Sequence, residues 1–449
     1  MPVLSTLEKN ASVIGRGINM LTAERPCNDY VKSNRIFNPN YVTIYKKNAN
    51  TKDVDVSFDY SICNLAKSVS ISVGEPSSAM AFSTFVKKNY KVPKSPLQEM
   101  VYGKITLDHI KETHYLQDDS YLDSLSTTFK NDLEKMEPRN LFNKYGTHII
   151  TEAGIGGSIA FGVIIPTDKD FGKNEYTNLL RTRFKNLQKD PTNSSYKSNI
   201  NILLNRADCM VIADGGKEFS SYDSTKVVNE YSSWISSLDI PAKRTFCSLP
   251  NINCLKPIWD FLPGNSRRRS NIYEYYYAEA EKIKKKLDAY TRCIHLIRIN
   301  SDPKKVNARV CEKGWVLVDQ DLNQGCKGNY IYLSYLPRYK KDDCDPIYDL
   351  MMIMENKAVK WSSKIYNLDR YRRIDTDLNE KAGGKYVYLC FTDVNRSFPP
   401  LSSITAYVDS KRPTCSDWNN VCWAYSSTPA DANIGAGGKY IYLLQKHIE

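Results

Sequence analysis

Few side chains in this sequence have the spacing that covalent chemistry requires. Five of the 449 residues are His, and His148, in a Tyr-Gly-Thr-His run, is the one that suggests a catalyst. The sequence has no Ser/His/Asp order typical of hydrolases, no glycine-rich phosphate loop and no paired carboxylates on one predicted face. We therefore interpret His148 as a hydrogen-bonding group of a turn or a core. We expect neither enzymatic activity nor a cofactor.

The twelve cysteines do not form a metal-binding pattern. The sequence contains no Cys-x-x-Cys pair and its His residues are scattered, so we expect no zinc or other metal site. Cys247 and Cys254 are spaced for a local disulfide. A mixture of bridges and thiols is equally compatible with the sequence.

The residues around His148 predict a helix end, a turn and a long strand. Residues 141–144 have the pattern of a helix end, and Tyr145-Gly146 that of the turn out of it. Residues 148–165 are rich in Ile, Val and Ala, which is typical of a buried strand. Glycines inside this strand indicate a bend, a bulge or the close approach of another backbone.

The run 145–157 resembles the signature of the membrane attack complex/perforin (MACPF) family. The one departure is Ile149, where the family pattern has an aromatic residue. The resemblance implies an α+β domain over residues 1–292, with a bent four-stranded antiparallel sheet flanked by helical clusters that refold into transmembrane β-hairpins. The matching residues are then architectural, forming a hinge; they are Tyr145, Gly146, Thr147, His148, Gly156 and Gly157.

Two segments flank the signature and are candidates for membrane insertion. In the first, about 61–100, apolar residues alternate with polar ones on either side of a Gly-Glu-Pro turn, which predicts an amphipathic hairpin. The residues expected to face lipid are Val69, Ile71, Val73, Met80 and Phe82.

The second candidate segment is about 165–210. Tyr176, Leu180, Phe184 and Leu187 follow helical spacing, and the stretch 190–193 interrupts it. We expect helices here that convert to strands. As an alternative, both flanking segments are ordinary packing elements.

The last third of the chain repeats itself three times. Fixed-period repeats indicate repeated supersecondary units packed together. Each unit has an Asp-x-Asn, a Gly-rich turn and a Tyr-x-Tyr-Leu strand, which predicts a small antiparallel sheet. The units span about 293–336, 347–392 and 404–444.

These repeats resemble a β-prism of the membrane-associated type, which implies an all-β three-fold domain at 293–449. Glycine turns beside Lys and Tyr suit sugars or lipid headgroups, although the turns are equally explained by hairpin chemistry alone. The second and third turns are expected to matter more than the first. The candidate binding residues are Lys385, Tyr386, Tyr388, Lys439, Tyr440 and Tyr442.

Charge and hydropathy constrain the partners. The net charge of +12 is spread over the chain, and the short basic runs at 267–269 and 284–286 are better interpreted as solvated faces than as a nucleic-acid site. The longest apolar runs are shorter than the ~18–20 residues of a membrane helix. The N-terminus shows no signal-peptide pattern.

From these observations we expect a secreted pore-forming protein. It would be a soluble monomer before it meets a target membrane, bind a lipid or glycan receptor through 293–449, and assemble there into a homo-oligomeric ring. The rival hypothesis is a non-lytic, lectin-like adhesion or scaffold protein with the same domains.

Overall fold

A computed structural model describes most of the chain. The described residues are 2–71, 99–167, 173–250, 253–342, 345–358, 360, 369–394, 399–413, 426–427 and 431–448. They form two compact units, one up to Asp288 and one from Ala289. The boundary expected from the sequence, 292/293, lies slightly later in the chain.

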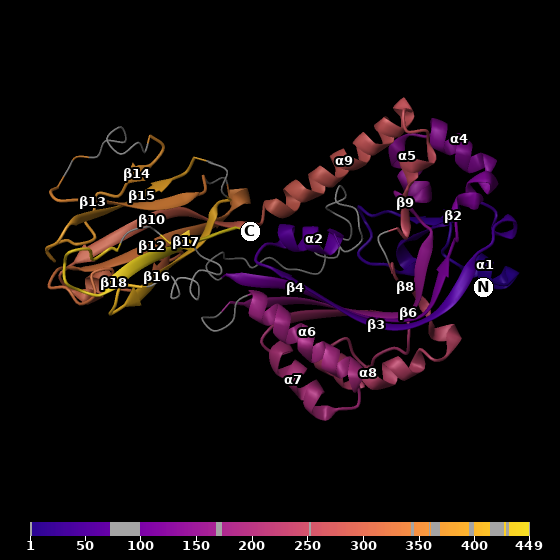
Figure 1. The fold of residues 1–449 in the computed structure, drawn as a ribbon, viewed down its shortest axis with the longest axis horizontal. Helices are drawn as coiled ribbons and strands as arrows, with labels where there is room; N and C mark the ends of the chain where they lie inside the picture. Colours follow the sequence, from indigo (N-terminus) through magenta and orange to yellow (C-terminus); the bar gives the residue numbers. More distant parts are fainter. Residues whose placement is uncertain are drawn as a thin grey trace. The chain divides into compact units, whose positions relative to one another are not determined.

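The first unit is built around a long antiparallel sheet with strand order β3-β4-β6-β7 (Figure 1). These strands are β3 (Tyr45–Asp59), β4 (Met100–Tyr115), β6 (Glu152–Pro166) and β7 (Asp208–Asp214). A short strand, β8 (Thr245–Ser248), pairs with the start of β6 beyond the end of β7. Sequence neighbours therefore pair as hairpins, β3 with β4 and β6 with β7.

A smaller sheet lies beside the start of β6. Its order is β2-β1-β5-β9, formed by β2 (Val31–Arg35), β1 (Arg16–Ile18), β5 (His148–Ile150) and β9 (Leu255–Pro257). The prediction of one continuous strand over 148–165 was wrong at Thr151. There the chain leaves the small sheet for the long one, and the Thr151 N–H donates to the Cys254 carbonyl at 2.9 Å.

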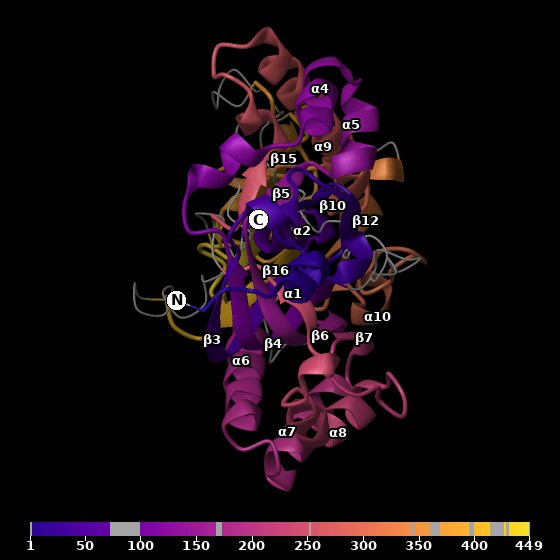
Figure 2. The same ribbon diagram turned by 90° about the vertical axis from the view of Figure 1, so that its right-hand side faces the viewer.

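Helices pack on both faces of the long sheet at β4 and β6, which bury side chains on both sides. On one face, alternate residues of β4 and β6 pack against α6 (Lys173–Lys189), α7 (Ser194–Leu204) and α8 (Ser224–Ser237). On the other face, the next residues along the same strands join a core with α2 (Ile62–Ile71) and α9 (Arg267–Asp288). Figures 1 and 2 show α6–α8 together on one side of the strands.

Shorter elements complete the first unit. They are α1 (Thr6–Ala11), α4 (Thr127–Lys135), α5 (Pro138–Tyr145), and the 3-10 helices η1 (Asn28–Tyr30), η2 (Pro39–Tyr41), η3 (Asp119–Ser124), η4 (Pro241–Lys243) and η5 (Ile258–Phe261). In the described part of the chain, no helix is long and apolar enough to cross a membrane.

The second unit consists of three three-stranded sheets of the same plan. In each, the central strand pairs with one long strand and one short strand, in the orders β10-β12-β11, β13-β15-β14 and β16-β18-β17. Apolar residues from all three sheets share one core. The strands are β10 (Arg292–Asp302), β11 (Val316–Val318), β12 (Tyr330–Tyr339), β13 (Asp349–Glu355), β14 (Arg372–Arg373), β15 (Tyr386–Thr392), β16 (Leu401–Asp409), β17 (Ser426–Ser427) and β18 (Tyr440–His447), with α10 (Lys305–Ala308) and η6 (Lys340–Asp342) between them.

Candidate functional site

The long sheet is irregular at one level across its three longest strands. Between Asn48 and Thr51 the pairing of β3 with β4 shifts register, and between Ile110 and Glu112 the pairing of β4 with β6 does the same. The pairing of β6 with β8 shifts between Gly154 and Ile155. Extra residues of this kind bend a strand and increase its twist. We call this level the bend, and the strands curve there in Figure 1.

Two signature glycines lie at the bend, opposite β4. A Cβ on Gly156 would collide with the carbonyl oxygen of His109. A Cβ on Gly157 would lie 2.7 Å from Trp234 Cζ2 and 2.9 Å from Leu238 Cδ2, too close for real atoms. Both positions therefore need glycine because another part of the chain occupies the space of a side chain.

Helix α8 rests directly on this level. The Trp234 indole N–H donates to the Gly215 carbonyl at 2.9 Å, and the Tyr231 hydroxyl lies 2.7 Å from His109 Nε2. Burial, followed by the nearby Lys52 and Lys111 charges, lowers the pKa of His109 to about 3. The imidazole is thus neutral at physiological pH, which suits its packing between the two aromatic rings.

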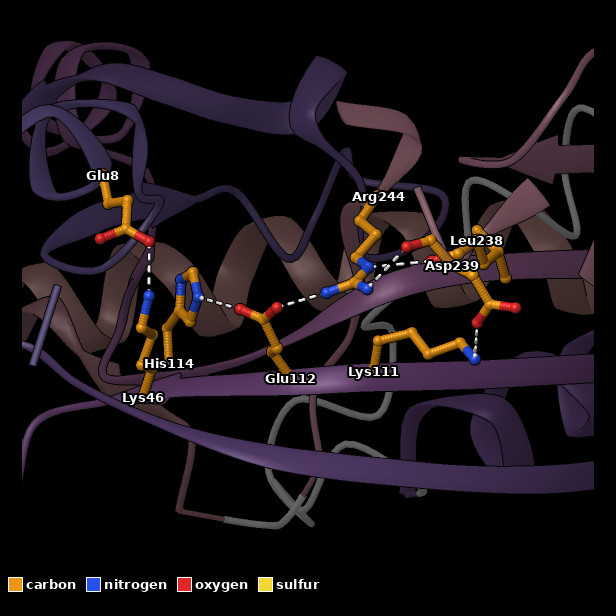
Figure 3. Close-up of polar contacts among 8 residues, drawn as sticks. All are labelled: Glu8, Lys46, Lys111, Glu112, His114, Leu238, Asp239 and Arg244. Carbon is orange, nitrogen blue, oxygen red and sulfur yellow. Dashed lines mark hydrogen bonds and ion pairs between the residues drawn. The ribbon is translucent and has the colours of Figure 1, made fainter. Parts of the chain in front are cut away.

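Ion pairs then tie the segment after α8 to β4 (Figure 3). Arg244 pairs with Glu112 and also donates to the carbonyl oxygens of Leu238 (2.9 Å) and Asp239 (3.2 Å). Lys111 Nζ lies 2.8 Å from Asp239 Oδ1. We call these four side chains, Lys111, Glu112, Asp239 and Arg244, the bend clamp, because they join the shifted residues of β4 to the end of α8.

The clamp continues toward the N-terminus more weakly. His114 Nε2 lies 3.4 Å from Glu112, and burial lowers the pKa of His114, which opposes a charged contact. Further along, Lys46 pairs with Glu8 at 2.5 Å. The hydrogen bond from Lys46 lowers the pKa of Glu8 to about 2. The sequence gives no signal for these contacts, because bonded partners stand up to 132 positions apart and carry no motif.

The remaining signature residues lie in the core beside the bend. Tyr145 ends α5, and its hydroxyl donates to Asp132 at 2.8 Å. Gly146 has φ +83°, and a Cβ there would lie 2.7 Å from the Ile18 nitrogen. Thr147 Oγ1 accepts the Met20 N–H at 2.9 Å. These contacts fix how the chain passes from α5 into the small sheet.

His148 is fully buried and faces aromatic rings. Its Nδ1 lies 2.9 Å from Thr147 Oγ1, and the rings of Trp259 and Tyr276 lie 5.3 and 5.6 Å away, centroid to centroid. Burial lowers the pKa of His148 to about 3. A neutral imidazole enclosed in this way packs the core.

One face of the long sheet carries an open polar cavity of about 950 Å³. Asp108 on β4 lines it and accepts from Ser158 Oγ at 2.6 Å. Burial raises the pKa of Asp108 to about 6. At the rim, Arg25 forms a two-pronged ion pair with Asp214, the last residue of β7.

The first flanking segment differs from its prediction. The alternation around Val69 and Ile71 predicts strand, but both residues lie in α2. Ser61 Oγ caps this helix by accepting the Cys63 N–H at 3.2 Å. The apolar positions before Val69 recur at helical spacing, and that longer pattern decides the structure; these buried residues are Ile62, Leu65 and Ala66. The other candidates, Val73, Met80 and Phe82, lie outside the described residues.

The second flanking segment has the predicted helices. Tyr176, Leu180, Phe184 and Leu187 form one buried face of α6, each at most 2% exposed. Asn193 caps α7 after the break, accepting the Tyr196 N–H at 3.2 Å. Arg181 and Gln188 also donate to backbone carbonyls of β3, so α6 is docked on the sheet by polar as well as apolar contacts.

The predicted binding residues of the second unit divide into two groups. Lys385, Lys439 and Tyr386 are exposed and Tyr440 is half-buried. Tyr388 and Tyr442 are only 6 and 8% exposed, so they were wrongly predicted to present aromatic faces. The two tyrosines of each pair are two residues apart and lie on the same face of their strand, where neighbouring groups cover the second tyrosine and leave the first more exposed. Arg373 lies 4.2 Å above the ring of Tyr388.

The first repeat has a feature that the sequence did not reveal. A polar cavity of about 770 Å³ surrounds its turn. Tyr330, Asp319 and Arg309 line it, and the last two form an ion pair at 2.5 Å. The first turn is therefore a further candidate for ligand binding, beside the predicted second and third turns.

The predicted disulfide is absent. Cys247 and Cys254 are both buried thiols. Cys247 belongs to β8 of the long sheet, and its Sγ lies 3.7 Å from the Gly154 carbonyl. Cys254 precedes β9 of the small sheet, so the chain changes sheets between the two residues. Among the described cysteines, none forms a bridge.

Comparison with known proteins gives structural likenesses alone. No family model matches the sequence, and neither does any curated protein. The structure is similar to GNIP1Aa from Chromobacterium piscinae, with 14% identity, a TM-score of 0.49, and coverage of 87% of this chain and 77% of that one. It is also similar to a protein from Bacteroides thetaiotaomicron, described as a cell invasion protein with a MAC/perforin domain, with 15% identity, a TM-score of 0.45 and coverage of 68% and 66%.

A weaker likeness is to the cytotoxin suilysin from Streptococcus suis, with 10% identity, a TM-score of 0.26 and coverage of 49% and 44%. Scores and identities at this level assign no activity. The signature residues of the first unit lie beside the bend of its long sheet.

Proposed function

We propose that this chain is a pore-forming protein whose two flanking segments become membrane-spanning hairpins. One observation carries the proposal. Strands β3 and β4 are antiparallel neighbours joined by residues 60–99, and β6 and β7 are antiparallel neighbours joined by 167–207. Each flanking segment is therefore already the connection of a hairpin, and its conversion to strand would lengthen a ladder that exists.

The lengths of the two connections support this conversion. Two spanning strands need roughly 20 residues, and each connection is longer. Their described helices, α2 and α6–α7, pack on opposite faces of the sheet. They could leave both faces without breaking the ladder between β4 and β6.

Assembly follows from the chemistry of a lipid bilayer. Lipid satisfies no backbone hydrogen bond, so an inserted sheet must close on itself. Four strands from one chain cannot close a barrel of this kind, and we infer a ring of many copies. Within the described residues, β3 pairs with β4 on one side, and on its other side only the start of the strand is paired, through a bridge from Tyr45 to Val3. The rest of that side is an edge for the next copy.

In this proposal the second unit is a three-fold β-prism that attaches the protein to its target membrane, and secretion brings it there. Its three similar turns place Lys, Tyr and glycine backbone together, a combination suited to lipid headgroups or glycans. Several weak contacts on one rigid unit act together by effective concentration. No enzymatic step is needed.

The experiment is release of a trapped dye from liposomes made of target-cell lipids, combined with electron microscopy of the same samples. Rings and dye release together are the expected result. Attachment without either would favour the rival hypothesis, a non-lytic adhesion or scaffold protein.

A further inference from the structure

The three turns of the second unit are linked head to tail by backbone hydrogen bonds. Each turn donates one N–H to a carbonyl of the next, and the third turn donates back to the first. The pairs are Asn329 to Glu380 (3.0 Å), Lys385 to Ile434 (3.1 Å) and Lys439 to Gln324 (2.9 Å). This closed chain of contacts places equivalent residues of the three repeats around one pseudo-three-fold axis.

One asparagine in each turn is buried within this ring. Asn323, Asn379 and Asn433 are 2, 3 and 3% exposed. Their Nδ2 atoms donate to a carbonyl of their own turn at 2.9, 2.7 and 2.8 Å. Those of Asn379 and Asn433 also reach a carbonyl of the next turn, at 3.4 and 3.3 Å. These bonds fix which end of each amide is nitrogen.

The oxygen ends of the same three amides have no protein partner. Asn323 Oδ1, Asn379 Oδ1 and Asn433 Oδ1 are all buried and accept no hydrogen bond from the described residues. Buried polar atoms are nearly always satisfied, so each such atom requires an explanation. Here the equivalent Oδ1 atom lacks a hydrogen-bond donor in all three repeats, which indicates one explanation common to the three.

The chemistry of these oxygens favours a small cation. They are neutral amide oxygens, like the carbonyl oxygens that replace the hydration shell of alkali ions. A water molecule donates only two hydrogen bonds, so a single water at the point where the turns meet would leave one of the three acceptors unsatisfied. The carboxylates of Asp321, Asp377 and Asp431 also stand two residues before each asparagine and bind its backbone N–H at 3.0 Å, which adds negative potential.

We propose that the three asparagines coordinate one monovalent cation, of the K⁺ or Na⁺ type, at the turn end of the second unit. The cation would join the three repeats where their turns meet. The expectation of no metal site rested on the Cys and His patterns, whereas these ligands are amides spaced 56 and 54 residues apart. The proposal does not depend on pore formation.

The first test is crystallography of the full chain grown in RbCl, with data collected at the rubidium edge. An anomalous peak within coordination distance of the three Oδ1 atoms is expected. Ordinary water density without anomalous signal at that position would overturn the proposal.

The second test is hydrogen exchange of the full chain in KCl, NaCl and choline chloride at equal ionic strength. Choline is too large to enter a site of this kind. We expect slower exchange in the alkali salts for the turn peptides around 321–330, 377–386 and 431–440, and equal exchange elsewhere. Identical exchange in all three salts contradicts the proposal.

Asn379→Ala supplies the matched comparison, since it removes one ligand. It also removes the Nδ2 bonds, so its loss of stability alone proves nothing. The readout is the difference between KCl and choline chloride, which should shrink or vanish. Asn300→Ala removes a similar amide-to-carbonyl bond, to Val310 at 2.9 Å, and should keep the full salt difference.

Discussion

The indole of Trp234 occupies the space that a side chain at position 157 would need. A Cβ on Gly157 would lie 2.7 Å from Trp234 Cζ2. The signature glycine and helix α8 are thus two halves of one contact, and neither can change without the other.

Gly157→Val should therefore displace α8 from the sheet. We expect the first unit to lose ~1–3 kcal/mol of unfolding free energy, as overpacked cores do, measured by chemical denaturation. If the variant folds, membrane attachment should persist while dye release is lost. Gly264→Ala is the control, because a Cβ there meets only one distant side-chain atom, at 3.9 Å. Equal stability of Gly157→Val and the wild type would show that a side chain at position 157 does not displace α8.

Breaking the bend clamp should loosen the sheet before it meets a membrane. Glu112→Gln removes one charge of a largely buried pair, and we expect faster hydrogen exchange over 224–248 and faster dye release. A hydrogen bond to a charged group contributes about 1.5–3 kcal/mol.

The charge swap Glu112→Arg with Arg244→Glu should restore part of the protection. Lys282→Gln breaks an exposed pair with Glu279 on α9 and should change neither measurement, because exposed pairs contribute little. Unchanged exchange in Glu112→Gln would show that the clamp does not restrain the bend.

Ile71→Arg tests the first flanking segment. A charge on the lipid face of a barrel costs ~2–4 kcal/mol at the midplane, and a ring repeats that cost in every copy. We expect dye release to be lost while liposome attachment in a flotation assay stays normal. Val306→Arg adds the same charge at an 80% exposed position of the second unit and should leave release intact. Continued leakage from Ile71→Arg would mean that this segment stays out of the membrane.

Mild acid should destabilise the first unit through its buried histidines. The folded pKa values of His109 and His148 are about 3, below the usual ~6.5. Between these values the unfolded chain binds protons that the folded chain does not, so stability falls as pH drops. Asp108, whose folded pKa is raised to about 6, has the opposite effect on stability between pH 6 and 4, because there the folded chain binds the extra proton. This single carboxyl group opposes the effect of two histidines.

The measurement is the unfolding free energy at pH 7 and pH 5. His109→Gln should show a smaller difference between the two pH values than the wild type does. An equal difference would place the pH sensitivity elsewhere.

Lys385 and Lys439 should contribute to attachment. Each Lys near an anionic surface is worth about 1 kcal/mol, so the double change to Glu should weaken binding to phosphatidylserine vesicles by at least roughly tenfold. Lys341→Glu, in η6 after the end of β12 that lies away from its turn, is the control. Unaltered binding of the double variant would move the attachment surface to another face, the cavity at the first turn included.

The sequence predicted what short-range patterns determine. Helical spacing located α6 and its buried face, and the repeated Asp-x-Asn turns located three sheets of equal plan. The wrong expectations concerned segments whose local pattern fits two kinds of secondary structure. Ser-Val-Ser-Ile alternation at 68–71 fits both a strand and the end of a helix, and the core around Leu65 decides for the helix.

The clamp could not be predicted at all. Arg244 and Glu112 are ordinary charged residues in the sequence, and only the return of the chain from α8 to β8 brings them together. The three asparagines were visible as a repeat, but their unpaired oxygens depend on how the turns meet.

The closed order of hydrogen bonds among the three turns has a consequence for how this chain can vary. An open stack of repeats can gain or lose a member at either end, because each member contacts only its neighbours. Here the last turn donates back to the first, so a fourth repeat would have no place and a missing one would leave two neighbours unmatched. Because this cycle of hydrogen bonds is closed, however, no repeat is required to come first in the chain. A circularly permuted chain that starts at the second sheet should keep all three contacts, provided a linker joins the old ends.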